Sequence, residues 1–291
     1  MAIITYRAAL AAALREELAR DERVFIIGGE VGFAASASSV TAGMVAEFGE
    51  RRIRDAPRSD ATLVAAAIGA ALGGLVPVVT MSSAALASAA AGQLMDHRNL
   101  PIVIRAPLGE HTRAGRARAA AFAPLATGLT GVRVIAPASP ADAKGMLKAA
   151  IRCGGPVIAI EHQSLYESRG EVSSDPDRVA PLEGARIIRE GAGLTIVACS
   201  RAVSEAARAA ATLADRGIDA EVIDLRALVP LDAALVAASI AKTGRAIIAS
   251  EGLAEIAASI YRRAFASLRA PIESVTAARA SDIVNIAIGL A

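Results

Sequence analysis

The sequence predicts an α/β protein of two domains, with parallel sheets covered by helices. Its 291 residues correspond to about two domains at roughly 150 residues each. Short apolar runs alternate with helical stretches along the chain, as in successive strand–helix–strand units. Most of these runs are continuously apolar rather than alternating, which is typical of strands buried on both faces of a parallel sheet.

The elements follow one another in a regular order. Residues 1–22 alternate apolar and charged residues at helical spacing, so the chain is expected to begin with a helix. Helix start signals lie at Pro140-Ala141-Asp142, at Arg201 or Ser204, and at Asp232 after Pro230. They predict helices over 140–152, 201–216 and 232–242. The expected strands are 24–27, 76–81, 102–105, 132–136, 157–160, 194–199, 220–225, 246–250 and 272–275.

A polar stretch over 162–184 interrupts this alternation. It carries two prolines and has no hydrophobic periodicity, as expected of a linker. We therefore expect a first domain over 1–165, a linker over 166–184 and a second domain over 185–291.

Composition excludes several classes of protein. A formal charge of +2 provides no basic field for nucleic acid. Two cysteines outside any CxxC pair fit a reducing, cytoplasmic compartment. The uncharged run over 61–95 is long enough to span a bilayer, but it is rich in small residues and Pro77 interrupts it. We expect no membrane segment and no nucleic-acid partner.

Common catalytic motifs are missing from the sequence. Glycines follow the first expected strand in Gly28-Gly29-Glu30-Val31-Gly32, but their spacing is not that of a GxGxxG fingerprint. The sequence also contains no Walker A motif and no GxSxG nucleophile elbow. Composition and spacing alone indicate only a soluble α/β protein.

The order of longer motifs indicates a family. DERVFIIGGEVG, RIRDAPRSDATLVAAAIGAALGGLVPVV, PIVIRAP, GVRVIAPASPADAKGMLKAAIR, PVIAIEHQSLYESRGEV and GIDAEVIDLRALVPLD occur in sequence. Together they resemble the β subunit of the thiamine-diphosphate-dependent decarboxylating component of 2-oxoacid (pyruvate-type) dehydrogenases. The wider relative is the C-terminal half of transketolase. The resemblance implies a pyrimidine-binding domain over 1–165 and a transketolase C-terminal domain over 185–291.

The resemblance also implies a cofactor and a partner. Family members bind thiamine diphosphate with Mg²⁺ between chains, and an α-type subunit with a GDG motif holds the metal and the diphosphate. The present sequence contains no GDG, so another chain is expected to bind the metal and the diphosphate. An α₂β₂-type heterotetramer is expected, with β–β contacts through the small-residue helices 61–74 and 84–95.

Two acids match family positions. Asp60 ends Asp55-Ala56-Pro57-Arg58-Ser59-Asp60, where the family has a glutamate that bonds the aminopyrimidine ring and relays its proton. Asp60 is shorter by one methylene, and either Asp60 or Ser59 could instead cap the following helix. Glu30 lies in the turn that follows the first strand, where it would help shape the cofactor pocket or be a solvated turn residue.

Other matched positions depart from the family pattern. Ser82 and Ala84 stand where aromatic residues pack on the pyrimidine. Arg118 occupies, by ungapped counting, the position of the family's substrate-facing histidine, and His111 lies nearer the preceding strand. Either is a candidate for meeting the substrate; the alternative is a solvated loop.

Three functions follow from these observations. The first is a catalytic β-type subunit, an oxidoreductase or transferase that acts on a 2-oxoacid or ketose together with an α-type partner. The second is a degenerate scaffold or regulatory subunit, which the missing aromatic residues and histidine motivate. The third is the C-terminal subunit of a split transketolase, for which the arginine-rich loop is the only hint.

Overall fold

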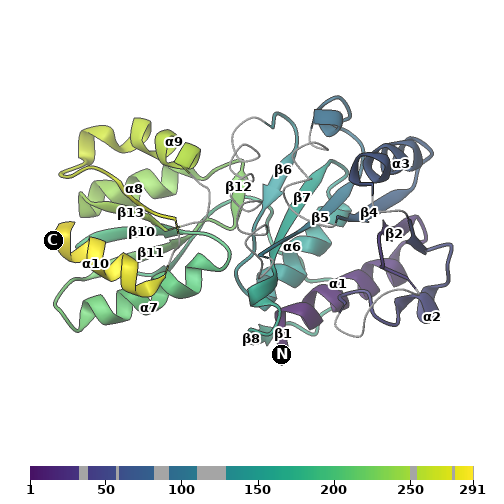
Figure 1. Ribbon diagram of the computed structural model, residues 1–291, viewed down its shortest axis with the longest axis horizontal. Coiled ribbons are helices and arrows are strands. Elements are labelled where there is room, and N and C mark those ends of the chain that lie inside the picture. The colour runs from purple at the N-terminus through teal and green to yellow at the C-terminus, as the bar shows by residue number, and fades with distance from the viewer. Residues whose placement is uncertain are drawn as a thin grey trace.

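A computed structural model describes residues 1–32, 39–56, 59–81, 92–109, 129–249, 254–276 and 279–290. These residues form two bodies side by side, each with a sheet between helices (Figure 1). The first body contains β1 (Ala2–Thr5), α1 (Tyr6–Arg20), β2 (Val24–Gly28), α2 (Met44–Phe48), β3 (Ile53–Asp55), α3 (Asp60–Leu72), β4 (Val76–Thr80), β5 (Val103–Leu108), β6 (Arg133–Ile135), α6 (Pro140–Arg152), β7 (Val157–His162), η2 (Gln163–Leu165) and β8 (Arg169–Val172).

The second body continues the alternation. It contains β9 (Arg186–Arg189), β10 (Leu194–Ala198), α7 (Ala202–Ala214), β11 (Ala220–Asp224), β12 (Ala227–Val229), α8 (Ala233–Thr243), β13 (Ala246–Ala249), α9 (Ala254–Ala264), η3 (Phe265–Ser267), β14 (Glu273–Val275) and α10 (Ala280–Leu290).

The larger sheet has the strand order β12-β6-β7-β5-β4-β2-β3. All its neighbouring strands are parallel except β12, which pairs antiparallel with β6. The second sheet has the order β14-β13-β10-β11-β9, and only β9 is antiparallel. The α/β fold expected from the continuous apolar runs is therefore confirmed, and both sheets bury apolar residues against helices.

β12 ties the two bodies together. It follows β11 of the second sheet, yet it lies at the edge of the first sheet (Figure 1). One hydrophobic cluster runs across this junction and joins residues such as Ile158 to Ile223 and Ile248. The second body thus packs on the first through a continuous apolar core.

The nine expected strands are all present, and the helix expected over 140–152 has those bounds. Ser139 caps it by accepting a hydrogen bond from Asp142 N at 3.1 Å. The helix expected from residue 1 begins instead at Tyr6, because 2–5 form β1. β1 pairs antiparallel with β8, which lies in the stretch expected to be a linker. Such a pair joins segments far apart in the chain, and helical spacing alone could not show it.

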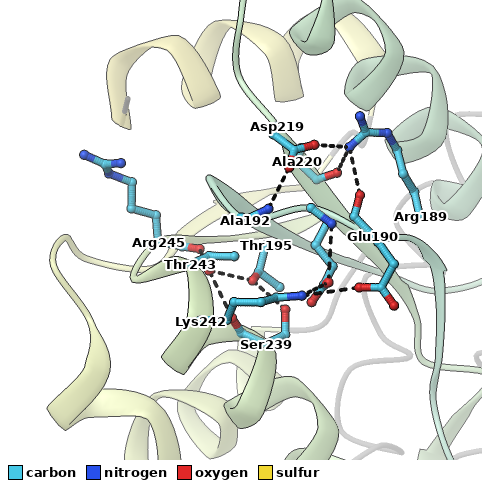
Figure 2. A network of polar contacts seen from close by, with 12 residues as sticks. Arg189, Glu190, Ala192, Thr195, Asp219, Ala220, Ser239, Lys242, Thr243 and Arg245 are labelled. Atoms are coloured by element: carbon cyan, nitrogen blue, oxygen red, sulfur yellow. Dashed lines mark hydrogen bonds and ion pairs between the residues drawn. The ribbon is translucent and has the colours of Figure 1, made fainter.

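A partly buried polar network lies at the amino end of the second sheet (Figure 2). The Thr195 hydroxyl lies 2.7 Å from Ser239 Oγ and 2.8 Å from Thr243 Oγ1. Nearby, Lys242 donates to the fully buried carboxylate of Glu221 and also pairs with Glu190. Buried polar groups are tolerated when they are hydrogen-bonded, so this network fixes how β10, β11 and α8 meet.

A group of charged side chains lies where α6 of the first body meets β9 and β11 of the second. Asp142 on α6 pairs with Arg186 Nη2 at 2.7 Å and with Arg226 Nη2 at 3.2 Å. Asp224, fully buried at the end of β11, lies 3.5 Å from Arg186 Nη2 and accepts from Arg226 N at 3.1 Å. Burial, and next the charge of Asp142, raise the pKa of Asp224 to about 6.

This pKa predicts how stability changes with pH. Because the folded pKa lies above the usual value of 3.8, protonation favours the folded state. The contribution of Asp224 is complete below its unfolded pKa and is lost as the pH rises through about 6. At roughly 1.4 kcal/mol per pKa unit, lowering the pH from about 7.5 to about 5 should favour the wild type over Asp224→Asn by about 1 kcal/mol. Urea unfolding at both pH values measures this difference, and a difference that does not change with pH contradicts it.

None of the helices in the described ranges is both long and apolar enough to cross a membrane.

Candidate functional site

The candidate site lies at the carboxyl edge of the larger sheet. Since β2, β3 and β4 are parallel, their last residues meet there: Gly28 is level with Asp55 on one side and with Thr80 on the other. β5 and β7 end at the same edge, where Leu108 is level with His162. In open α/β sheets this edge is where ligands bind.

A tight turn follows β2 at this edge. Asp55 Oδ1 accepts hydrogen bonds from Val31 N at 2.8 Å and Gly32 N at 2.7 Å. Glu30 has a left-handed backbone with φ 59°, and it is exposed. At Gly28 a Cβ would come within 2.5 Å of the Thr80 carbonyl oxygen, so only glycine lets the two strand ends approach this closely.

α3 begins beside this turn. The Ala56 amide, just after β3, donates to the Gly28 carbonyl at 2.9 Å and so ties the approach to α3 to the end of β2. Ser59 is the N-cap residue, although its side chain makes no capping bond; it lies 2.8 Å from Thr62 Oγ1. Asp60 is the first helical residue. Of the two candidates for the cap, Ser59 therefore holds the position, and the role of Asp60 stays a prediction.

A buried ion pair lies among the central strands of this sheet. Arg105 on β5 makes two bonds of 2.7 Å to Glu161 on β7, and both side chains are at most 3 % exposed. Arg105 Nη1 also donates to Thr80 Oγ1 at 3.2 Å, and the Tyr166 hydroxyl donates to Glu161 at 3.0 Å. Burial, the largest single effect, lowers the pKa of Arg105, but the charge and hydrogen bonds of Glu161, together with Tyr166 and Tyr6, outweigh it and the net pKa is raised. This cluster fixes the ends of β4, β5 and β7 relative to one another.

His162 is the last residue of β7, and the backbone at Gly109 passes close to its ring. A Cβ at Gly109, where φ is 99°, would lie 2.6 Å from His162 Cε1. The imidazole Nδ1 is 2.8 Å from Ser164 Oγ, and His162 is buried. The backbone after β5 is thus packed directly on this ring, where a larger residue would not fit.

Of the residues expected from the sequence, the structure brings Glu30 and Asp60 to this one edge. Ser82, Ala84, His111 and Arg118 lie outside the described residues. Within the described ranges, His, Cys, Asp and Glu side chains form no group of three that could hold a metal ion.

Sequence reasoning missed Asp55, Arg105 and Glu161 as site-supporting residues. A signal was available for the last two: opposite charges stand inside the apolar runs VIRAPL and VIAIEH. Such charges are almost never fully buried unless they are paired.

Asp55→Ala is expected to lower the free energy of unfolding by about 2–3 kcal/mol, since two bonds to a charged acceptor are lost. Asp55→Asn keeps an acceptor oxygen and should lose less. Urea unfolding of both variants measures the effect. A loss below about 0.5 kcal/mol for Asp55→Ala would show that the turn does not depend on this carboxylate.

The fold, with its candidate site at this edge, belongs to a known class of protein. Two family models match the chain. A transketolase pyrimidine-binding domain matches residues 2–169, and a transketolase C-terminal domain matches residues 183–285. The first match alone covers more than half of the chain. The chain therefore belongs to the transketolase-like family in which the β subunits of 2-oxoacid dehydrogenases are found, which confirms the resemblance.

Particular relatives agree with this assignment. The chain is 38% identical to the mitochondrial pyruvate dehydrogenase E1 component subunit beta-1 of Arabidopsis thaliana, over 94% of this chain and 81% of that protein. It is 33% identical to the 2-oxoisovalerate dehydrogenase subunit beta of Bacillus subtilis, over 94% and 89%. A solved split-gene transketolase, an inactive β4 tetramer, matches in fold with a TM-score of 0.79 at 22% identity over 98% of this chain and 97% of that one.

Proposed function

We propose that this chain is the β-type subunit of a two-chain, thiamine-diphosphate-dependent enzyme that acts on a 2-oxoacid. The observation that carries the proposal is the position of Asp60. It begins α3 at the carboxyl edge of the larger sheet, beside the turn that holds Glu30. The relatives named as pyruvate and 2-oxoisovalerate dehydrogenase subunits support the 2-oxoacid.

The residues at this edge suit an aminopyrimidine. Such a ring needs a carboxylate for its nitrogen and apolar surface for its faces. At this edge Asp60 begins α3, Glu30 lies in the turn after β2, and Val31 and Met81 are buried. Thiamine diphosphate, when bound, supplies a nucleophilic carbon and an electron sink for decarboxylation. These residue types therefore fit the group, and the pyrimidine-binding domain is proposed over 1–165, with the C-terminal domain over 185–291 beyond a 166–184 linker.

Each residue has a proposed task. Asp60 holds and relays a proton at the pyrimidine nitrogen, and Glu30 shapes the pocket wall. Ser82 and Ala84 line the pyrimidine from the segment after β4. His111 or Arg118 meets the substrate from the segment after β5, as an acid–base group or as a carboxylate anchor.

The partner is proposed to be an α-type chain that holds Mg²⁺ and the diphosphate through a GDG motif. Self-association through α3 would complete an α₂β₂ heterotetramer. The exposed residues on that helix are small or apolar and carry no charge in the described stretch: Ala61, Thr62, Ala65, Ala66, Gly69 and Leu72. Such a face suits close contact with another subunit better than contact with water.

The assembly is tested by light scattering of this chain co-expressed with an α-type partner. We expect a mass of two chains of each kind. Ala66→Arg places a charge in the proposed β–β contact and should halve that mass to one αβ pair. The matched control is Ala211→Arg on α7, an exposed alanine of the second body, which should leave the mass unchanged. A monomeric β chain beside its partner contradicts this assembly.

Substrate turnover by the same complex tests the activity. Decarboxylation of pyruvate or a branched 2-oxoacid is expected only with thiamine diphosphate and Mg²⁺ present. Turnover of a ketose phosphate alone would favour a split transketolase. A stable complex that turns over neither class would support the scaffold function.

A further inference from the structure

A pocket lies where β12, at the edge of the larger sheet, meets α9 of the second body. Its volume is about 570 Å³, and it lies between the segment from β12 to the start of α8 and one face of α9. β12 runs antiparallel to β6, so the chain leaves β12 toward the amino edge of the larger sheet. Its principal lining residues are Leu228, Val229, Leu231, Ile256, Arg262 and Arg263.

The pocket combines an apolar floor with positive charge. Leu228 and Ile256 belong to the main hydrophobic cluster, and Val229 and Leu231 are half-buried beside them. Among the described residues that line it, Arg262 and Arg263 are the charged ones. Both are exposed, and neither side chain forms a hydrogen bond or ion pair within the described part of the chain.

The acid within the lining segment from β12 to the start of α8 is already engaged. Asp232 accepts from Leu235 N at 3.0 Å, which caps α8, and from Ala185 N at 3.1 Å. Its carboxylate therefore already serves two amides. Neither guanidinium group has an acidic partner among the described residues, so both suit a negatively charged ligand.

Helix position alone explains part of this arrangement. Arginines in the last turn of a helix interact favourably with its dipole, and Arg262 and Arg263 both lie in the last turn of α9. A dipole effect requires no pocket, however. Arg20 in the last turn of α1 provides the matched comparison, since it is also exposed but does not line this pocket.

We propose that this pocket binds a small organic anion with an apolar body, such as a medium-chain carboxylate. Its volume lies within the range of about 300–1,000 Å³ that small-molecule sites occupy. Paired guanidinium groups bind carboxylates through two parallel hydrogen bonds, while the floor buries the apolar part. Binding at this pocket would require neither thiamine diphosphate nor an α-type partner.

Octanoate titrated into the full-length chain by calorimetry tests the proposal. We expect saturable binding at one site, weakened at least tenfold by the double variant Arg262→Gln/Arg263→Gln. The control Arg20→Gln should bind like the wild type. Octanol and octylammonium, which keep the apolar chain without the carboxylate, should bind at least tenfold more weakly than octanoate.

A second pair of variants tests the location. Ser259 lines the pocket, so Ser259→Phe should fill it and abolish octanoate binding. Ala258 is exposed on the same helix and is absent from the lining, so Ala258→Phe should have no effect. Absence of saturable octanoate binding, equal binding of octanol, or equal binding by the double arginine variant would overturn the proposal.

Discussion

Glu161→Ala is expected to lower the free energy of unfolding by about 3–5 kcal/mol, the usual effect of removing one partner from a buried ion pair. The variant leaves the Arg105 guanidinium, at 3% exposure, with Thr80 Oγ1 as its one remaining described hydrogen-bond acceptor. It also removes the acceptor of the Tyr166 hydroxyl. Urea denaturation followed by circular dichroism measures the loss.

A double variant separates the charge from the packing. Arg105→Met/Glu161→Leu replaces both ions with apolar side chains, so no charge is left buried without its partner. We expect it to recover most of the stability that Glu161→Ala loses. If the double variant were as unstable as Glu161→Ala, the loss would come from packing and not from the stranded guanidinium. A loss below about 1 kcal/mol for Glu161→Ala would contradict the role of this pair.

Asp60→Asn is expected to lower kcat of the αβ complex by about 10²–10⁴-fold, the usual contribution of a positioned acid–base group. Asparagine can still accept and donate hydrogen bonds, but it cannot exchange a proton at the pyrimidine nitrogen. Folding should change little, because Asp60 is the first residue of α3 and Ser59 holds the cap position. Steady-state decarboxylation at saturating thiamine diphosphate gives the ratio of kcat values.

Two controls accompany Asp60→Asn. Asp60→Glu keeps the acid and restores the reach of the family's glutamate, so it should retain or exceed wild-type turnover. Ser59→Ala changes the neighbouring cap residue and should leave kcat within about threefold, since the Ser59 side chain makes no capping bond. Equal turnover by wild type and Asp60→Asn would show that Asp60 is not the proton relay.

Much of the fold could be predicted from the sequence because it follows local signals. Continuous runs such as Val157–His162 mark strands buried on both faces, and Pro140 with Ser139 marks a helix start. The missed strands depend on distant partners. β1 pairs with β8, and the three residues of β12 pair with β6 far back in the chain. Short segments of this kind carry too little periodicity to be recognised alone.

The candidate site was predictable only in part, for a related reason. The family motif identified Asp60 and Glu30, but no local pattern shows that Asp55 accepts from the Val31 and Gly32 amides across two strands. Ser82, Ala84 and Arg118 follow from their match to family positions, and His111 from its place near the preceding strand. Their roles therefore stay predictions.

Calorimetric titration of thiamine diphosphate, with Mg²⁺, into this chain co-expressed with an α-type partner tests the central proposal most directly. We expect micromolar, saturable binding by the wild-type complex and binding at least tenfold weaker when Asp60→Ala is introduced. Light scattering on the same samples establishes that the complex is intact. An intact, well-folded complex that binds no thiamine diphosphate would contradict the catalytic function and leave the scaffold function in its place.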